Sequence, residues 1–335
     1  SMPVPWPVDS RGRRDPRRMI CPEEDLENGR CPIQARGISL RQLRDVQELL
    51  MRVCKANLLK DSEDLSKPLI WSNINQHQIR WRMIMKVIPQ EDSCSWVELV
   101  GERPQWPKFF VSHNWSEPFR DFMVAMEHHA RDVGARSRDA YWICVYAINQ
   151  WLPDVGSYLE TGPFITALRN TGSAVLMLDK TASSLNRLWC LLEIYIILTK
   201  HDSLLDWELP NLRILTPMGV LGSARVSSGP VVEALKSADS TQGSASRPPD
   251  KRQILNYIAG RNETAGLKVN GKELVVPKEL DKDVPPDYET QLLEEHIEDF
   301  EKFNKAIYDW AAKQHEENNL IARHPGRKDG KDSSG

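Results

Sequence analysis

One acidic residue, Glu193, interrupts a strongly apolar stretch of the chain and is the first candidate for chemistry. The other ten residues from Leu188 to Leu198 are apolar. A stretch this apolar predicts a helix buried on most sides, because an exposed helix shows a polar face. Burying a carboxylate is costly unless the group has a partner or a function. Glu193 is therefore either a functional acid or a side chain that reaches the helix rim or caps backbone amides.

The elements around this helix are predicted to place further polar residues at one edge of a sheet. From Trp106 onward, predicted strands alternate with predicted helices, which is typical of a parallel sheet covered on both faces. Three polar clusters directly follow such strands, and doubly wound sheets bind ligands outside the carboxyl ends of their strands. We therefore expect one pocket there, although each cluster alone would be an ordinary loop. The binding candidates are Ser112, His113, Asn114, Trp115, Asn149, Gln150, Trp151, Asp179 and Trp189, the last of which lies one helical turn before Glu193.

Apolar periodicity and turn residues define the remaining elements. The predicted strands are 109–111, 141–147, 174–178 and 212–215, and the main predicted helices are 39–59, 118–133, 162–170, 185–200 and 288–314. The last helix either packs on the chain's own core or forms a coiled coil, and its aromatic residues favour the core. The predicted segments are a disordered basic arm (1–36), an N-terminal helical layer (37–104), the α/β domain (105–217), an extension (218–286) with a disordered loop (237–249) and a hairpin (267–276), an acidic amphipathic helix (287–318) and a disordered tail (319–335).

Composition excludes several classes of protein. With 335 residues, a net charge of −3 and 40% apolar residues, the chain has the composition of an ordinary soluble globular protein. The six cysteines form no CxxC pair, so we expect free thiols and a cytoplasmic location. The spacing of histidines and cysteines predicts no metal site, and only the short arm is basic enough to attract nucleic acid. No secretory signal or membrane span is evident, so no membrane partner is expected.

Two stretches resemble parts of Toll/interleukin-1 receptor (TIR) domains. The segment 164–193, FITALRNTGSAVLMLDKTASSLNRLWCLLE, is similar to the second half of that domain and ends in its Trp-Cys-Leu-x-Glu element. The segment 108–115, KFFVSHNW, resembles the first strand of the family and the loop after it. The longer string 94–122, followed by 141–151, is similar to TIR-like proteins of unicellular eukaryotes. The resemblance covers roughly residues 93–216, a third of the chain.

This resemblance implies a flavodoxin-like, three-layer α/β fold with additional N- and C-terminal helices. The family contains members that hydrolyse or cyclise NAD⁺ and members that only assemble with like domains. In the enzymatic members the glutamate of this helix is catalytic, which implies that Glu193 is the catalytic carboxylate of an NAD⁺ nucleosidase. NAD⁺ or a related nucleotide would be the substrate, no further cofactor is implied, and Trp115 and Trp151 could stack on its rings. A homo-oligomer formed through the TIR-like domain is also implied.

Two other functions remain open. The loop 149–161 is long, and in TIR domains the corresponding loop governs both assembly and access to the site, so catalysis could be silent. The chain would then be a non-catalytic module for self-association and signalling. A third possibility is a domain that senses a nucleotide without turning it over. No Gly-x-Gly-x-x-Gly or phosphate-binding loop is present, so the sequence does not predict how phosphates would be recognised.

Overall fold

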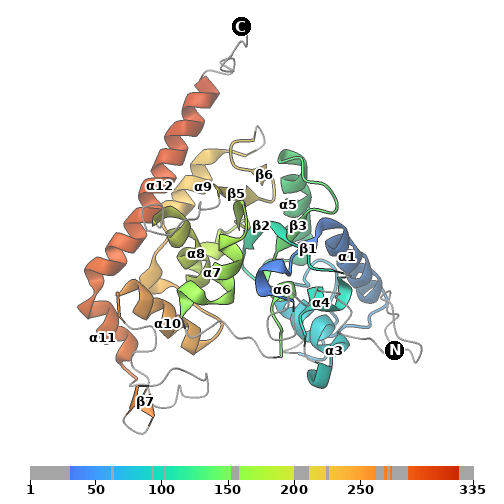
Figure 1. Ribbon diagram of the computed structural model, residues 1–335. Coiled ribbons are helices and arrows are strands. Elements are labelled where there is room, and N and C mark those ends of the chain that lie inside the picture. The colour runs from blue at the N-terminus through green and yellow to red at the C-terminus, as the bar shows by residue number, and fades with distance from the viewer. Residues whose placement is uncertain are drawn as a thin grey trace.

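The computed structural model of the protein describes residues 31–61, 64–92, 94–101, 103–151, 158–199, 211–223, 226–261, 268–269, 272–273 and 286–323. Within them, a six-stranded sheet lies between helices (Figure 1). Its order is β1-β3-β2-β4-β5-β6, with β3, β2, β4 and β5 parallel and the two edge strands antiparallel. The strands are β1 (Ile38–Ser39), β2 (Pro107–Ser112), β3 (Ala140–Trp142), β4 (Ser173–Met177), β5 (Asn211–Thr216) and β6 (Gly219–Val220).

Alternate residues of the strands face opposite sides of the sheet, as the period of two in a β-strand requires. Val111 and Val175 belong to the core on one face, whereas Phe110 and Ala174 belong to the core on the other. Both faces are apolar, so these strands are continuous hydrophobic runs, as expected for a sheet covered on both sides. This explains why the apolar runs 109–111, 174–178 and 212–215 predicted strands, and those predictions are confirmed within a few residues.

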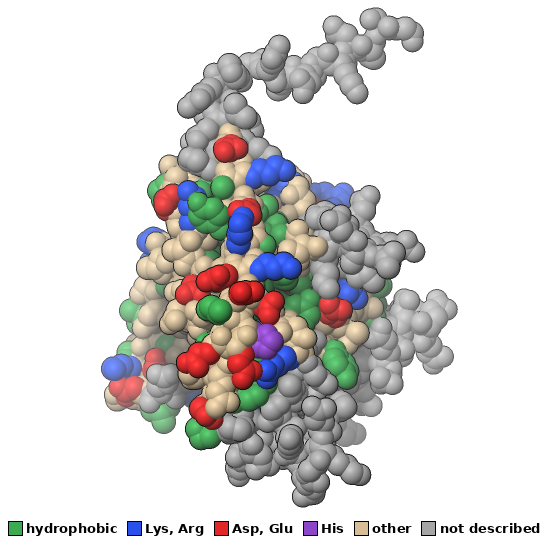
Figure 2. Space-filling view, turned by 90° about the vertical axis from the view of Figure 1, so that its left-hand side faces the viewer, with side chains coloured by type: hydrophobic (Ala, Val, Ile, Leu, Met, Phe, Trp, Pro, Cys, Tyr) green, Lys and Arg blue, Asp and Glu red, His purple; other side chains and the backbone are tan. Residues whose placement is uncertain are grey.

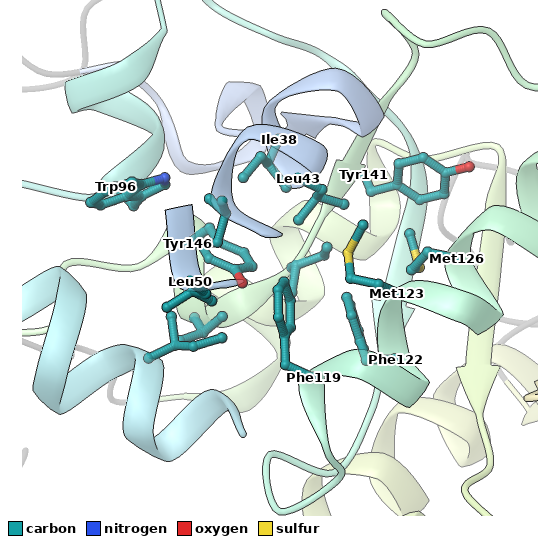
Figure 3. Packing of buried hydrophobic residues seen from close by; sticks show 14 of the residues in the cluster. Ile38, Leu43, Leu50, Trp96, Phe119, Phe122, Met123, Met126, Tyr141 and Tyr146 are labelled. Carbon is teal, nitrogen blue, oxygen red and sulfur yellow. The ribbon is translucent and has the colours of Figure 1, made fainter. Parts of the chain in front are cut away.

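The first face is covered by α1 (Leu40–Lys55) and α5 (Phe119–Asp132) together with the other N-terminal helices. Ser39 caps α1 in a capping box with Gln42. Figure 3 shows the rings of Phe119 and Phe122 on α5 side by side, in the same core as Tyr141 and Tyr146. The other helices before β2 are η2 (Ile33–Ala35), α2 (Gln76–Ile79), the π-helical η3 (Arg80–Ile84), α3 (Met85–Val87), η4 (Gln90–Asp92) and α4 (Trp96–Val100).

The second face is covered by α7 (Pro163–Arg169) and α8 (Leu188–Thr199), with later helices packed outside them. The predicted helix around Glu193 is therefore confirmed as α8. Its apolar residues divide between two cores, one shared with α7 and α10 and the other with α9 and α12. The other elements are η5 (Leu159–Thr161), η6 (Ser183–Asn186), α9 (Ser228–Lys236), η8 (Ser240–Gln242), α10 (Pro248–Ile258), α11 (Tyr288–Glu295), α12 (Ile297–Arg323) and the short hairpin β7 (Lys268–Val269) and β8 (Lys272–Glu273).

The prediction of one long strand over 141–147 was wrong. The strand β3 ends at Trp142, and α6 (Cys144–Ala147) follows almost at once. All but one of the residues in this run are buried, and an apolar run buried on every side has no periodicity that separates a strand from a helix. The helix packs against the N-terminal layer, where the Tyr146 hydroxyl donates a hydrogen bond to Gln76 Oε1 at 3.1 Å.

Two segments predicted to be disordered are partly or wholly folded. Residues 31–36 of the expected arm include η2 and the buried Cys31, whereas residues 1–30 lie outside the described residues. The expected loop 237–249 contains η8 and the first residues of α10. Its serine-rich composition is misleading, because the Asn304 side chain accepts a hydrogen bond from Ser240 N at 2.9 Å and donates one to Asp239.

The acidic C-terminal helix is two helices, α11 and α12, rather than one. They are separated at His296, whose ring meets Asp299 Oδ2 at 3.0 Å and accepts a hydrogen bond from Arg261 Nε. Phe300, Phe303 and Ile307 are buried, which confirms packing on the chain's own core. Figure 2 shows acidic side chains exposed over these helices. The helix α12 runs to Arg323, so residues 319–323 of the predicted tail are helical, and 324–335 lie outside the described residues.

No helix in the described part of the chain combines the length and the apolar composition that crossing a membrane requires.

Candidate functional site

A cavity of about 410 Å³ lies at the carboxyl ends of β2 and β3, against the first turns of α8. This volume is within the range typical of pockets that bind small molecules. Its wall combines aromatic rings, arginines and the carboxyl group of Glu193. The lining residues are Arg80, Val111, Ser112, His113, Trp115, Trp142, Cys144, Ile148, Gln150, Phe164, Arg187, Trp189, Cys190, Glu193, Ser246, Arg247 and Asp250.

Glu193 is buried in the fold yet lines this cavity. Glu193 is only 4% exposed, and no ion pair joins its carboxyl group to another side chain in the described residues. Burial raises the pKa of Glu193 to about 8, and the nearby Ser112 hydroxyl opposes that rise. Glu193 is thus neither turned into bulk water nor neutralised by an arginine, which are the arrangements that would have excluded a functional role.

Two polar side chains at the end of β2 are buried in the wall without ordinary partners. Neither the Ser112 hydroxyl nor either ring nitrogen of His113 has a hydrogen-bond partner of normal geometry within the described residues. Burial lowers the pKa of His113 to about 4, so the imidazole is neutral at pH 7. Buried polar groups are nearly always paired, and unpaired ones in a cavity wall are groups that a bound ligand or water can satisfy.

Aromatic rings form a continuous part of the wall. The ring of Phe164 stacks on Trp189, with centroids 4.4 Å apart and an interplanar angle of 20°, and it meets Trp142 edge to face. Trp115 lies on another part of the wall, where its indole N–H donates a hydrogen bond to Cys144 Sγ at 3.1 Å. Burial raises the pKa of the Cys144 thiol to about 12, so this thiol is not a nucleophile at neutral pH.

Three arginines on the wall were not among the candidates chosen from the sequence. Arg80 comes from η3, Arg187 directly precedes α8, and Arg247 directly precedes α10. Residues so far apart in the chain form no motif, so only the tertiary structure brings them together. The one sequence signal was the position of Arg187 at the end of the serine-rich loop before Trp189. Arginine is the side chain best suited to binding phosphate.

Gln150 lines the cavity, but its side chain is committed to the backbone. Its side-chain amide donates hydrogen bonds to Val145 O and Ile148 O, and its backbone carbonyl accepts one from Arg80. The predicted candidates that reach the wall are Ser112, His113, Trp115, Gln150, Trp189 and Glu193.

Four other candidates are not on the cavity wall. The Asn114 amide donates a hydrogen bond to Ser183 Oγ at 2.7 Å, and the Ser183 hydroxyl in turn donates to Asp179. Trp151 packs beside the N-terminal layer, where its indole N–H donates to Ile88 O at 2.7 Å, and its backbone N–H bonds to Asn149 Oδ1. Asn114, Asp179, Asn149 and Trp151 therefore hold loops in place beside the cavity.

Within the described residues, no group of three or more His, Cys, Asp or Glu side chains is arranged to hold a metal ion. Comparison of the chain with models of protein families, with curated proteins and with solved structures gave no match.

Proposed function

We propose that this protein is an NAD⁺ nucleosidase that cleaves the bond between nicotinamide and ribose, with Glu193 as the catalytic carboxylate. The observation that carries the proposal is the position of Glu193, a buried acid that no described side chain neutralises, on the wall of a ligand-sized cavity. A buried acid with a raised pKa in a cavity is a typical feature of functional sites.

The composition of the wall matches the parts of a dinucleotide. The rings of Trp115 and the Trp189–Phe164 pair are available to the planar nicotinamide. Arg80, Arg187 and Arg247 supply positive charge for phosphates. Glu193 would then interact with the ribose that carries the nicotinamide.

One carboxylate is sufficient for this reaction. Ordinary glycosidases need a second carboxyl group as a general acid, because the leaving alcohol is poor. Nicotinamide leaves as a neutral base, taking the bonding electron pair from C1′ with it. An ionised Glu193 would stabilise the oxocarbenium-like cation of the ribose until water attacks C1′ and releases ADP-ribose and a proton. The positive charge of the bound nicotinamide ring favours the ionised form of Glu193.

The order of the strands supports a flavodoxin-like, TIR-like fold. Taken in chain order, the four parallel strands β2, β3, β4 and β5 lie in the sheet as second, first, third and fourth. This order is compatible with that of flavodoxin-like sheets, which bind ligands at the point where the strand order reverses. Here the reversal lies between β2 and β4, and the carboxyl end of β2 supplies Ser112 and His113 to the cavity wall. The TIR-like segments 108–115 and 164–193 both contribute to that wall.

The direct test is release of nicotinamide from NAD⁺ by the purified protein, followed by chromatography, with Glu193→Gln as the comparison. Glutamine keeps the size of the side chain but cannot carry the negative charge, so release should fall by a factor of about 100 or more. Equal release by the two proteins would remove Glu193 from the mechanism.

A nucleotide sensor is the second function that the cavity supports, because neither ring nitrogen of the buried His113 on its wall has a hydrogen-bond partner of normal geometry in the described residues. A sensor would be stabilised against heat by ADP-ribose while releasing no nicotinamide at any protein concentration. Self-association that depends on protein concentration and is unchanged in Glu193→Gln, without binding of nucleotide, would instead indicate an assembly module.

A further inference from the structure

Three cationic side chains of the cavity come from three separate parts of the chain. Arg187 belongs to the TIR-like segment, whereas Arg80 comes from the N-terminal helical layer and Arg247 from the extension after the sheet. The segments outside the α/β domain thus complete the wall of the cavity that contains Glu193.

Bringing these arginines together has an electrostatic cost. Burial and the positive charge of Arg247 both lower the pKa of Arg80. Burial, and then the charges of Arg187 and Arg80, lower the pKa of His77. Asp250 lies on the same wall and offsets part of this charge. Like charges held near one another in a cavity are stabilised when an anion binds between them.

Arg80 has a side-chain donor left for such an anion. Arg80 Nη2 donates to Gln150 O at 3.1 Å, whereas its buried Nε–H has no partner in the described residues. Arg187 reaches the hydroxyls of Ser244 and Ser246. The start of α10 adds few donors, because its first residues are Pro248 and Pro249, which lack N–H groups. Anion binding here therefore depends on side chains.

On the basis of the proposed function, we infer that Arg80, Arg187 and Arg247 bind the diphosphate of the substrate and select a dinucleotide over a nucleoside. These are specificity-determining residues, because they act on the phosphates rather than on the bond that breaks. The N-terminal helical layer, through Arg80, and the extension, through Arg247, thereby determine the size and charge of the substrate that the cavity accepts.

The test is binding of ADP-ribose and of nicotinamide riboside to the full chain carrying Glu193→Gln, by isothermal titration calorimetry. ADP-ribose should bind at least about tenfold more tightly than the riboside, and its affinity should fall as salt is added. Arg80→Gln, Arg187→Gln and Arg247→Gln should each weaken ADP-ribose binding about tenfold or more and leave riboside binding unchanged.

Arg82→Gln is the matched control, because Arg82 lies on the same π-helix but bonds to Asp61 O and is not on the cavity wall. It should bind ADP-ribose like the parent. Arg80→Lys keeps the charge and should lose less affinity than Arg80→Gln, and thermal unfolding of each variant shows whether it is folded.

The outcomes separate this inference from the proposed function. Equal affinity for ADP-ribose and nicotinamide riboside, or folded arginine variants that bind ADP-ribose like Arg82→Gln, would overturn the diphosphate site even if NAD⁺ is cleaved. Tight, arginine-dependent binding of ADP-ribose without release of nicotinamide by the parent chain would uphold the site and reject the nucleosidase.

Discussion

The indole of Trp189 stacks on the ring of Phe164 at 4.4 Å, and Trp189 lies one helical turn before Glu193. The first ring comes from α8 and the second from α7, so this pair joins the two helices that cover one face of the sheet at the cavity. The same helix thus positions the aromatic wall and the carboxyl group. A change in the stacked pair should therefore change the binding of the proposed substrate.

Replacing Trp189 with alanine should raise the KM for NAD⁺ about tenfold or more, because a large ring that the nicotinamide can contact is lost. Trp189→Phe keeps an aromatic face and should retain most of the affinity. Steady-state kinetics of the two variants measure the difference. Equal KM values in Trp189→Ala and the parent would show that the stack has only a structural role.

The pH dependence of kcat/KM should follow the ionisation of Glu193. Burial raises its pKa to about 8, and the reaction requires the ionised form, so kcat/KM should increase with pH and level off above about pH 8. Ser112→Ala should move this profile to higher pH, because the Ser112 hydroxyl lowers the pKa of Glu193. A profile unaffected by Ser112→Ala would contradict the assigned cause.

The free energy of unfolding should also depend on pH through Glu193, but it should decrease as the pH rises. Between about pH 4.5 and pH 8, Glu193 is protonated in the folded state and ionised in the unfolded state. The folded state then binds more protons, so this contribution is complete below about pH 4.5 and is lost as pH rises through about 8. Glu193→Gln should therefore be more stable than the parent above pH 8.

Chemical denaturation at several pH values measures this difference. Glu117 contributes in the same direction because burial also raises its pKa to about 8, so the comparison must be between the parent and Glu193→Gln at each pH. A difference in free energy of unfolding that does not change between pH 5 and pH 9 would mean that Glu193 is ionised throughout.

The packing of α8 on the segment after η8 should be sensitive to one methyl group. A Cβ added at Gly243 would lie 2.6 Å from Leu188 Cδ2 and 2.7 Å from Leu188 Cγ, where Leu188 is buried at the start of α8. Gly243→Ala should destabilise the fold by about 1–3 kcal/mol, the usual cost of overpacking. Gly172→Ala is the control, since a Cβ there meets no atom within 4 Å. Equal midpoints of urea unfolding in the two variants would show that α8 adjusts without cost.

Trp151 and Trp115 should have different roles, although both were candidates for stacking on the nucleotide. Trp151→Phe removes the hydrogen bond to Ile88 O and should lower the free energy of unfolding by about 1 kcal/mol without changing the affinity for ADP-ribose. Trp115→Ala should weaken that affinity, because Trp115 lines the cavity. Calorimetric titration of both variants decides the assignment.

The sequence by itself determined the elements whose apolar pattern is strong. The periodicity of 118–133 and the continuous runs at 109–111 and 174–178 were sufficient to predict α5, β2 and β4, because side-chain burial alone dictates those patterns. The carboxylate inside the apolar run of α8 also stood out, since burial of an acid is costly wherever the helix packs.

Only the tertiary structure decided which polar residues surround that carboxylate. Asn114 and Asp179 were placed correctly after their strands, but their side chains connect two loops instead of lining the cavity. Arg80, Arg187 and Arg247 have no mutual spacing that would reveal them in the sequence. Arg80 lies before the strands of the α/β domain and Arg247 lies after them, so only the folded chain brings them to one cavity. Local patterns determine where a residue lies on its own element, whereas the direction of a polar side chain depends on partners that are distant in the chain.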